Sequence, residues 1–384
     1  MSELIQKNDR AAIRWKLLTS ASALALTACV STMNVANAED ADRPLVWIEI
    51  GGQFDRFSGQ GSPFTPPFVN TTDWSADNLK SPAGIQTMHL SSIGGDASIS
   101  FEPTDSDWVF SAAVRYGRSN GQKFVHQQRT QTTRFQVPGH FGSKYFTKTA
   151  PPSYAQTGAT RHESHFIADF QAGKDVGLGM FGHDATSVFG VGIRFAQLIQ
   201  KAQTALYAQP GVKFVPGTFL GSPAPTIGNY HRYYAKAQRA SSFRGIGPSI
   251  SWNASAPVLG NAPEGEITVD WGANAAMLFG RQKAKAHHHT TGSYRYGSGM
   301  GKYHHRVTAV LPPGTGRRTQ SRSLLVPDLG GFAGLSFRYS NAKLSLGYRG
   351  DFFFNAMDTG IATRRSENVG FYGPFASISI GLGG

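Results

Sequence analysis

Apolar residues at every second position constrain the fold of this chain more than any other feature. Between residues 267 and 277 the odd positions are Ile, Val, Trp, Ala, Ala and Met, and positions 268 to 274 between them are Thr, Asp, Gly and Asn. Similar alternation recurs at 48–55, 108–117, 165–171, 189–196, 245–252, 335–339, 344–354 and 377–382. Strand side chains alternate between two faces, so this period predicts a sheet with one apolar and one polar face.

The connections between these segments distinguish a soluble sandwich from a membrane barrel. Short connections at 103–107, 175–186, 254–264 and 340–342 alternate with long ones at 58–93, 119–161, 199–241, 282–323 and 355–369. Outer-membrane barrels combine short periplasmic turns with long outer loops. We therefore predict an all-β fold, a transmembrane antiparallel up-and-down barrel of about ten strands. Eight and twelve strands remain alternatives, since strand boundaries err by a few residues.

Composition favours many short strands over helices. The chain has 45 Gly, 26 Phe and 13 Tyr, and only 16% of its residues are charged. No run of 18 apolar residues follows Ala38, so no helical membrane span is expected. Trp108 and Trp252 lie next to short turns, as an indole belt at one membrane interface would require. Trp47 begins the first strand, but its position has the wrong parity for a lipid-facing side chain.

The first 38 residues resemble a secretory signal peptide. A basic start precedes a 14-residue, mainly apolar run from Leu17 to Val30, which is too short to span a bilayer as a helix. Two processing sites compete: a lipoprotein box ending at Cys29, and cleavage after Ala38. A barrel needs no lipid anchor, so cleavage after Ala38 is favoured. We expect a signal peptide at 1–38, a barrel domain at 39–384 and an outer-membrane location in a Gram-negative cell.

Basic residues gather in three of the long connections. Segments 119–160, 199–241 and 281–322 contain 19 Lys and Arg residues and no acidic residue. Such loops could bind the phosphates of lipopolysaccharide or focus anions toward a pore. A solvated surface beside an anionic leaflet, without a ligand, explains the same charges. Nucleic acid is not an expected partner. The residues predicted to form a ligand-binding loop are Lys283, Lys285, Arg295, Lys302, Arg306, Arg317 and Arg318.

The polar face of the sheet should line the interior of the barrel. The charged residues predicted to line a pore are Glu49, Arg115, Asp169, Arg194, Asp270, Arg338 and Arg349. Buried charges need partners, so we expect these acids and arginines to pair. Ten strands leave little open bore. The sequence thus predicts a narrow, anion-preferring pore or a structural barrel with cationic extracellular loops. The alternative is a surface adhesin that binds lipopolysaccharide or a host ligand through those loops.

Catalytic and metal sites are not expected. His162, Glu163, His165 and Asp169 lie on one predicted strand, but no nucleophile motif accompanies them, so we predict no enzyme. The histidines at 287–289 and 304–305 could capture a metal, but no carboxylate or cysteine accompanies them. We expect no metal site and no cofactor.

Two motifs carry a resemblance to a known family. One strand begins with Phe243, Gly245, Gly247 and Pro248 in the pattern F-x-G-x-G-P, and the last strand contains F-Y-G-P at 371–374. With the stretches 265–280 and 344–353, these motifs resemble the Legionella-type major outer membrane protein family over roughly residues 160–384. The resemblance implies an outer-membrane barrel with porin or surface-attachment roles. It also implies outer-membrane lipid and the periplasmic assembly machinery as partners.

Overall fold

The computed structural model of this protein describes residues 46–58, 91–103, 106–129, 132–137, 144–149, 153–176, 186–209, 212–214, 217–219, 222–224, 228–261, 264–298, 305–360 and 363–382. All secondary-structure elements in these stretches are β-strands, and none of the described residues forms a helix that could cross a membrane. One compact unit spans Val46–Gly381. The expected signal peptide and Cys29 lie outside the described residues.

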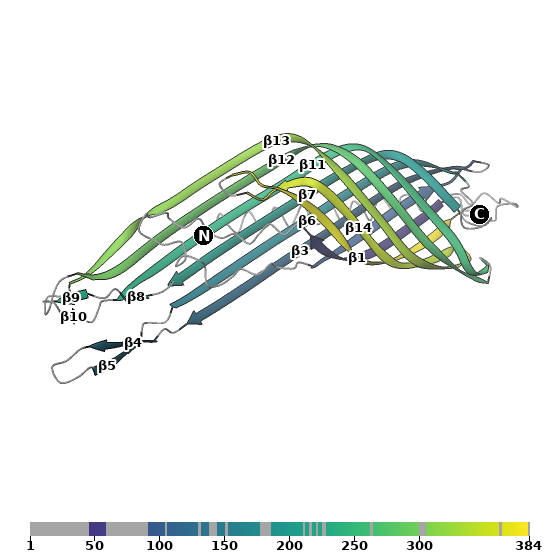
Figure 1. The fold of residues 1–384 in the computed structure, drawn as a ribbon. Helices are drawn as coiled ribbons and strands as arrows, with labels where there is room; N and C mark the ends of the chain where they lie inside the picture. Colours follow the sequence, from purple (N-terminus) through teal and green to yellow (C-terminus); the bar gives the residue numbers. More distant parts are fainter. Residues whose placement is uncertain are drawn as a thin grey trace, which may run out of the picture. The chain divides into compact units, whose positions relative to one another are not determined.

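Ten antiparallel strands close into a barrel, which confirms the predicted fold and strand number (Figure 1). Each strand pairs with the next along the chain, and β15 pairs with β1, so the barrel has no open edge. The strands are β1 (Val46–Ser58), β2 (Ser91–Phe101), β3 (Trp108–Arg129), β6 (Ser153–Asp175), β7 (Thr186–Gln209), β11 (Gly228–Asn261), β12 (Gly265–Ser298), β13 (His305–Tyr339), β14 (Ala342–Asp358) and β15 (Ser366–Leu382).

Five short strands lie outside the ring of ten. β8 (Val212–Phe214) pairs with β11, β4 (Thr132–Val137) pairs with β5 (Lys144–Thr149), and β9 (Gly217–Phe219) pairs with β10 (Ser222–Ala224). They occupy two of the segments predicted as long connections. They contribute nothing to the closure of the barrel.

The barrel has a short-turn end and a long-strand end. β1 begins and β15 ends at the short-turn end, where the predicted short connections lie. β11 continues to Asn261, so the connection predicted at 254–264 is shorter than expected. Gly260 and Gly265 beside this turn have φ angles of +84° and +119°, a region that glycine enters without a steric penalty.

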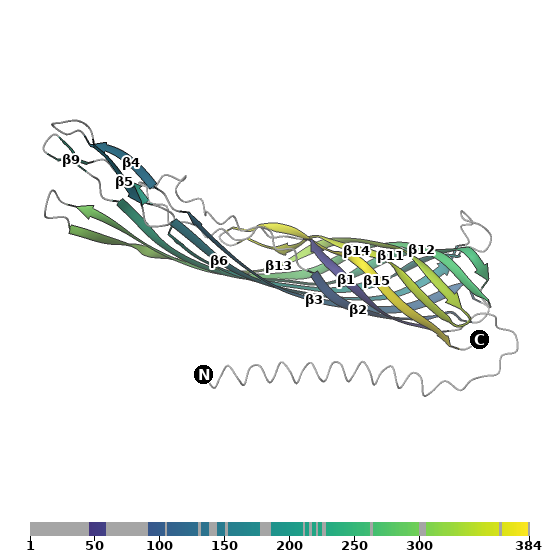
Figure 2. The ribbon, with the colours of Figure 1, turned by 90° about the horizontal axis from the view of Figure 1, so that it is seen from below.

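Three of the long connections predicted as loops are largely strand, which corrects the sequence-based boundaries. Pairing of β12 with β13 continues to Ser298 and His305, whereas β14 leaves β13 at the level of Asp328. Beyond that level β3, β6, β7, β11, β12 and β13 continue as an open, curved sheet (Figures 1 and 2). The apolar alternation stops where these strands leave the barrel, so the pattern that revealed the strands could not show their full length.

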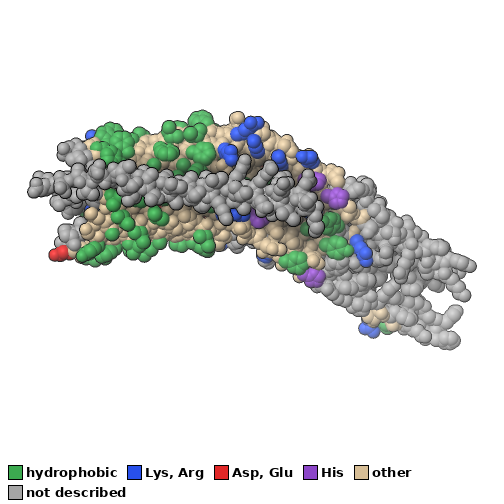
Figure 3. Space-filling view, turned by 180° about the vertical axis from the view of Figure 1, so that it is seen from behind, with side chains coloured by type: hydrophobic (Ala, Val, Ile, Leu, Met, Phe, Trp, Pro, Cys, Tyr) green, Lys and Arg blue, Asp and Glu red, His purple; other side chains and the backbone are tan. Residues whose placement is uncertain are grey.

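Large apolar side chains cover the outer face of the barrel (Figure 3). On β12 the outward apolar positions run from Ile267 to Phe279. That distance is about 40 Å along a strand, or about 28 Å along the barrel axis at a tilt of about 45°. It matches the apolar band of about 25 Å on transmembrane barrels. Exposed members on other strands include Ile50, Phe54, Ile93, Phe110, Phe170, Val191, Ile193, Ile246, Ile250, Leu335, Leu346, Phe352 and Ile378.

Candidate functional site

A buried arginine joins its own strand to three others inside the barrel. Arg194 of β7 is 2% exposed. Its Nε and Nη2 donate hydrogen bonds of 2.6 and 3.2 Å to Asp169 of β6. Its Nη1 donates to Asp328 of β13 at 2.5 Å and to Asn274 of β12 at 2.7 Å. β11 and β12 separate β7 from β13 in the sheet, so the contact with Asp328 crosses the interior.

A second arginine extends this arrangement to the other side of the barrel. Arg115 of β3 donates to both carboxylate oxygens of Asp351 on β14, and its Nη2 lies 4.0 Å from Asp169. Two further acid–base pairs complete what we call the polar layer, with N···O distances of 3.5 and 3.6 Å: Arg349 with Asp96, and His165 with Asp55. The cavity left among these side chains measures about 10 Å³, room for about one water molecule.

An apolar layer fills the interior on the long-strand side of the polar layer. Its members occupy the next inward positions toward the long-strand end of the barrel. On β6, Ile167 lies on that side of Asp169, and on β14, Phe353 lies on that side of Asp351. The ring of Phe371 packs 4.9 Å from Phe57 and 6.1 Å from Phe353, between centroids. The large side chains of the apolar layer are Phe57, Ile167, Leu198, Phe243, Leu278, Val326, Phe353, Met357, Val369 and Phe371, each at most 5% exposed.

Residues 356–360, which we call the cap segment, are buried in the barrel, where Met357 belongs to the apolar layer and the residues after it continue beyond that layer. Asn355 adopts φ +56° just before it, and the β14–β15 register shifts there. Backbone carbonyls of the segment accept hydrogen bonds from inward side chains of β11 and β12: Gln282 Nε2 donates to Ala356 at 2.8 Å, and Arg239 Nη1 donates to Thr359 at 2.7 Å. The cap segment is therefore fixed by strands two and three places away from β14 in the ring.

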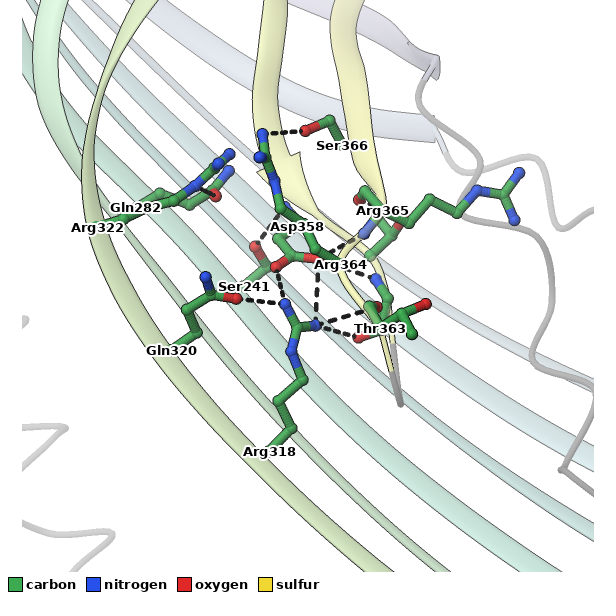
Figure 4. A network of polar contacts seen from close by, with 12 residues as sticks. Ser241, Gln282, Arg318, Gln320, Arg322, Asp358, Thr363, Arg364, Arg365 and Ser366 are labelled. Carbon is green, nitrogen blue, oxygen red and sulfur yellow. Dashed lines mark hydrogen bonds and ion pairs between the residues drawn. The ribbon is translucent and has the colours of Figure 1, made fainter.

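Asp358 is the anchor of the cap segment (Figure 4). Arg318 Nη2 of β13 donates to its Oδ2 at 2.6 Å, and the backbone amides of Gly360 and Arg365 donate to its Oδ1 at 3.1 Å each. The carboxylate lies six residues beyond the last exposed apolar position of β14, Phe352, and thus outside the apolar band. Burial opposes its ionisation, but the hydrogen bonds from Arg318 and the two amides leave the pKa of Asp358 below its ordinary value.

The short-turn end of the interior is more open. Asp270 of β12 accepts hydrogen bonds from Ser255 and Lys343, each at 2.6 Å. A cavity of about 210 Å³ lies beside them and reaches Glu49 of β1. Arg338 lies over the ring of Trp47 at 5.4 Å, so this tryptophan faces inward, as its parity predicted.

The seven residues predicted to line a pore occupy inward positions of their strands, and the expected pairing of Asp169 with Arg115 and Arg194 is present; that they line a pore stays a prediction. The sequence analysis did not select four of their partners, Asp96, Asp328, Lys343 and Asp351, nor Asp55, which pairs with His165. These share the inward parity of the selected residues, and Asp351 stands two positions after Arg349. Selecting every charged residue at an inward strand position would have identified them.

The predicted ligand-binding loop is distributed differently. Lys283, Lys285 and Arg317 lie on strands, exposed on the outer face, rather than in a loop. Arg318 faces inward and binds Asp358, which corrects its assignment to an exposed loop. Arg295 and Arg306 belong to β12 and β13, but their side chains, like the whole of Lys302, lie outside the described residues.

The histidines of β6 point to opposite faces. His162 is exposed outside, with its Nδ1 2.6 Å from Asn120 Oδ1, whereas His165 is buried with its ring 3.9 Å from that of Phe371. Within the described ranges, no three His, Cys, Asp or Glu side chains are grouped so as to hold a metal ion.

A closed barrel with an apolar exterior and charged groups inside is a β-barrel of the outer-membrane type. No protein-family model and no curated protein matches the chain. Matching solved structures include the Pseudomonas putida toluene transporter TodX, with 9% identity and a TM-score of 0.18 over 89% of this chain and 90% of that one. The outer-membrane expressed OmpT of Vibrio cholerae matches with 9% identity and a TM-score of 0.13 over 90% and 99%. At these TM-scores neither protein informs the fold or function of this one.

Proposed function

We propose that this protein is an outer-membrane barrel with a closed interior, which presents a cationic sheet at the cell surface instead of conducting solutes. The apolar layer is the observation that carries this proposal. Phe243, Leu278 and Val326 come from three adjacent strands and are fully buried, and Phe57 and Phe371 pack against each other on the opposite side of the ring. An ion crossing this level would lose its hydration without gaining a polar partner.

The polar layer also disfavours the anion-preferring pore that the sequence suggested. Five aspartates, Asp55, Asp96, Asp169, Asp328 and Asp351, stand against three arginines, Arg115, Arg194 and Arg349. A carboxylate excess across the interior repels anions. The pairs instead resemble a structural network that fixes the strands of a filled barrel.

In this proposal the short-turn end faces the periplasm and the open sheet faces outward, the arrangement usual for outer-membrane barrels. The open sheet continues about 20 residues past the apolar band on β12 and carries basic side chains on its outer face. A binding role at the surface agrees with these features better than a transport role. It also agrees with the attachment role that the family resemblance implies.

Planar-bilayer recording of the refolded protein tests the proposal. Folding is checked first, by β-type circular dichroism and by heat-modifiable migration in a denaturing gel. We expect a folded barrel that produces no reproducible conductance steps. Stepwise conductance that favours anions, and that changes when Arg115 or Arg349 is replaced by Gln, would overturn the closed barrel and establish the pore.

A further inference from the structure

We infer that the outer faces of β7, β11, β12 and β13, just beyond the apolar band, bind phosphate groups carried by lipids of the surrounding leaflet. The surface consists of six exposed basic residues, which we call the cationic band: Lys201, Arg244, Arg281, Lys283, Lys285 and Arg317. The inference rests on the membrane placement in the proposed function. It does not depend on whether the interior is closed.

The cationic band begins where the apolar band ends. On β12, Met277 and Phe279 are the last exposed apolar residues, and the next outward positions are Arg281, Lys283 and Lys285. Two residues of strand rise about 6.6 Å, or about 5 Å along the axis of a strand tilted by about 45°. The first basic residue therefore lies at the depth of the headgroups, where lipid phosphates are found.

Strand register places like charges directly opposite each other. Arg244 of β11 is paired with Arg281 of β12. Directly opposed like charges destabilise a sheet unless a counter-charge lies between them. Among the described residues, no carboxylate forms an ion pair with any member of the cationic band. An anion from outside the protein would supply the missing charge.

A hollow in the outer face gives such an anion room. Lys201 of β7 and Lys285 of β12 flank Ala240 of β11, and register aligns all three in one row across the sheet. A groove of about 550 Å³ lies over this row, and its lining includes small residues, Ala202, Ala240 and Ala286, beside the basic Lys201, Lys285 and Arg317. In Figure 3 the Lys, Arg and His side chains of the outer surface gather beyond the apolar band. The residues lining the groove include Thr160, His162, Gln203, Gln238, His287 and Thr319.

The chemistry of these groups selects phosphate. Arginine binds phosphate oxygens through paired N–H groups, and lysine adds a mobile point charge. Choline or ethanolamine headgroups add a positive charge of their own, so a phosphate monoester on a lipid-linked sugar fits better. A fixed array at the membrane surface also favours a lipid, because the apolar band already holds the acyl chains beside it.

Binding of purified bis-phosphorylated lipid A to the full-length barrel in detergent micelles tests the inference. Two double variants, Arg244→Gln/Arg281→Gln and Lys283→Gln/Lys285→Gln, should each bind at least tenfold more weakly than the unmodified protein. The matched control Lys174→Gln/Arg364→Gln removes two exposed charges elsewhere and should bind normally. Dephosphorylated lipid A should bind the unmodified protein as weakly as lipid A binds the variants.

Three results would overturn the inference: unchanged binding by both double variants, equal binding of dephosphorylated lipid A, or displacement of lipid A by an equal concentration of inorganic phosphate. The last would identify a site for free anions. Each variant is first shown to fold by circular dichroism and heat-modifiable migration. Conductance is recorded separately, so an open pore would refute the closed interior and leave the lipid result intact.

Discussion

Arg194 and Asp328 meet inside the barrel, 2.5 Å apart, although two strands separate β7 from β13 in the sheet. The ion pair therefore ties together strands that have no backbone hydrogen bonds in common. Arg194 also binds Asp169, so one guanidinium holds two buried carboxylates. Without it Asp169 would keep only Arg115, at 4.0 Å, and Asp328 would keep no ion-pair partner among the described residues. Its role is to hold the filled interior together.

Replacement of Arg194 by Met should destabilise the barrel by about 3–5 kcal/mol, the usual cost of leaving buried charges unpaired. Methionine fills much of the arginine volume, so the loss of stability measures the missing charge more than the missing packing. Urea unfolding of the refolded barrel in detergent micelles measures the change.

A neutral variant separates charge from packing in this network. In Asp169→Asn/Arg194→Met/Asp328→Asn none of the three replaced side chains is charged, Arg115 still pairs with Asp351, and much of the lost stability should return. If Arg194→Met unfolds at the urea concentration of the unmodified protein, the ion pair does not stabilise the barrel.

The sequence predicted the barrel, its ten strands and the inward set of charges for one physical reason. A membrane imposes one environment on every outward position, so alternation is regular from Ile267 to Met277 and parity assigns Asp270 and Asn274 to the interior. The apolar layer was not predicted, because Leu278 and Phe243 are apolar residues at inward positions. Pattern rules assign such residues to the lipid face, although their parity places them inside.

Truncation of side chains in the apolar layer should destabilise the barrel. Phe243→Ala removes a fully buried ring and should lower the free energy of unfolding by about 3–5 kcal/mol, and Leu278→Ala by about 2–5 kcal/mol. Both variants should remain electrically silent, because the polar layer still closes the interior. Urea unfolding and bilayer recording measure the two properties. A loss below 1 kcal/mol in both variants would mean that this layer is loosely packed.

A charge introduced into the apolar band should be destabilising in proportion to its depth. Val191 is the middle one of the three consecutive exposed apolar positions of β7, between Phe189 and Ile193, so Val191→Arg should cost about 2–4 kcal/mol in lipid vesicles. The matched variant Gln203→Arg places the same side chain on the same face of β7, beyond the band, and should cost less than about 1 kcal/mol. Equal costs at the two positions would show that this face does not lie in lipid.

The outward face also explains why the basic segments were mistaken for loops. Lys283 and Lys285 alternate with Ala284 and Ala286, so the period of two persists, but the outward residues are charged. Exposed lysines are common on strands that face water and on mobile loops alike, so they do not distinguish the two. Only the pairing of β12 with β11 and β13 distinguishes them, and that pairing is a long-range property.

Opening of the cap segment can be followed with a single cysteine. The only cysteine of the chain is Cys29, so Met357→Cys in a Cys29→Ser background provides one reporter, at a position that is 1% exposed. Labelling by a maleimide should be slow, and should accelerate at least tenfold when Arg318→Gln removes the anchor of Asp358. Arg317→Gln, on the opposite face of β13, serves as the control and should change nothing. Rapid labelling without Arg318→Gln would mean that the cap segment does not occupy the interior.

The contribution of Asp358 to stability should also depend on pH in a defined direction. The pKa of Asp358 is lower in the folded protein than its ordinary value of about 3.9, so its contribution is complete at neutral pH and disappears as pH falls through the folded value. The unmodified protein should therefore exceed Asp358→Asn in stability at pH 7, by about 1.5–3 kcal/mol for a charged hydrogen-bonded group. The difference should begin to shrink below pH about 4, where the unfolded chain takes up a proton at Asp358, and should vanish below the folded pKa, where both proteins carry a neutral side chain there. Urea unfolding of the pair at a series of pH values measures it, and a difference that is constant down to pH of about 2 would exclude ionisation of Asp358 as its source.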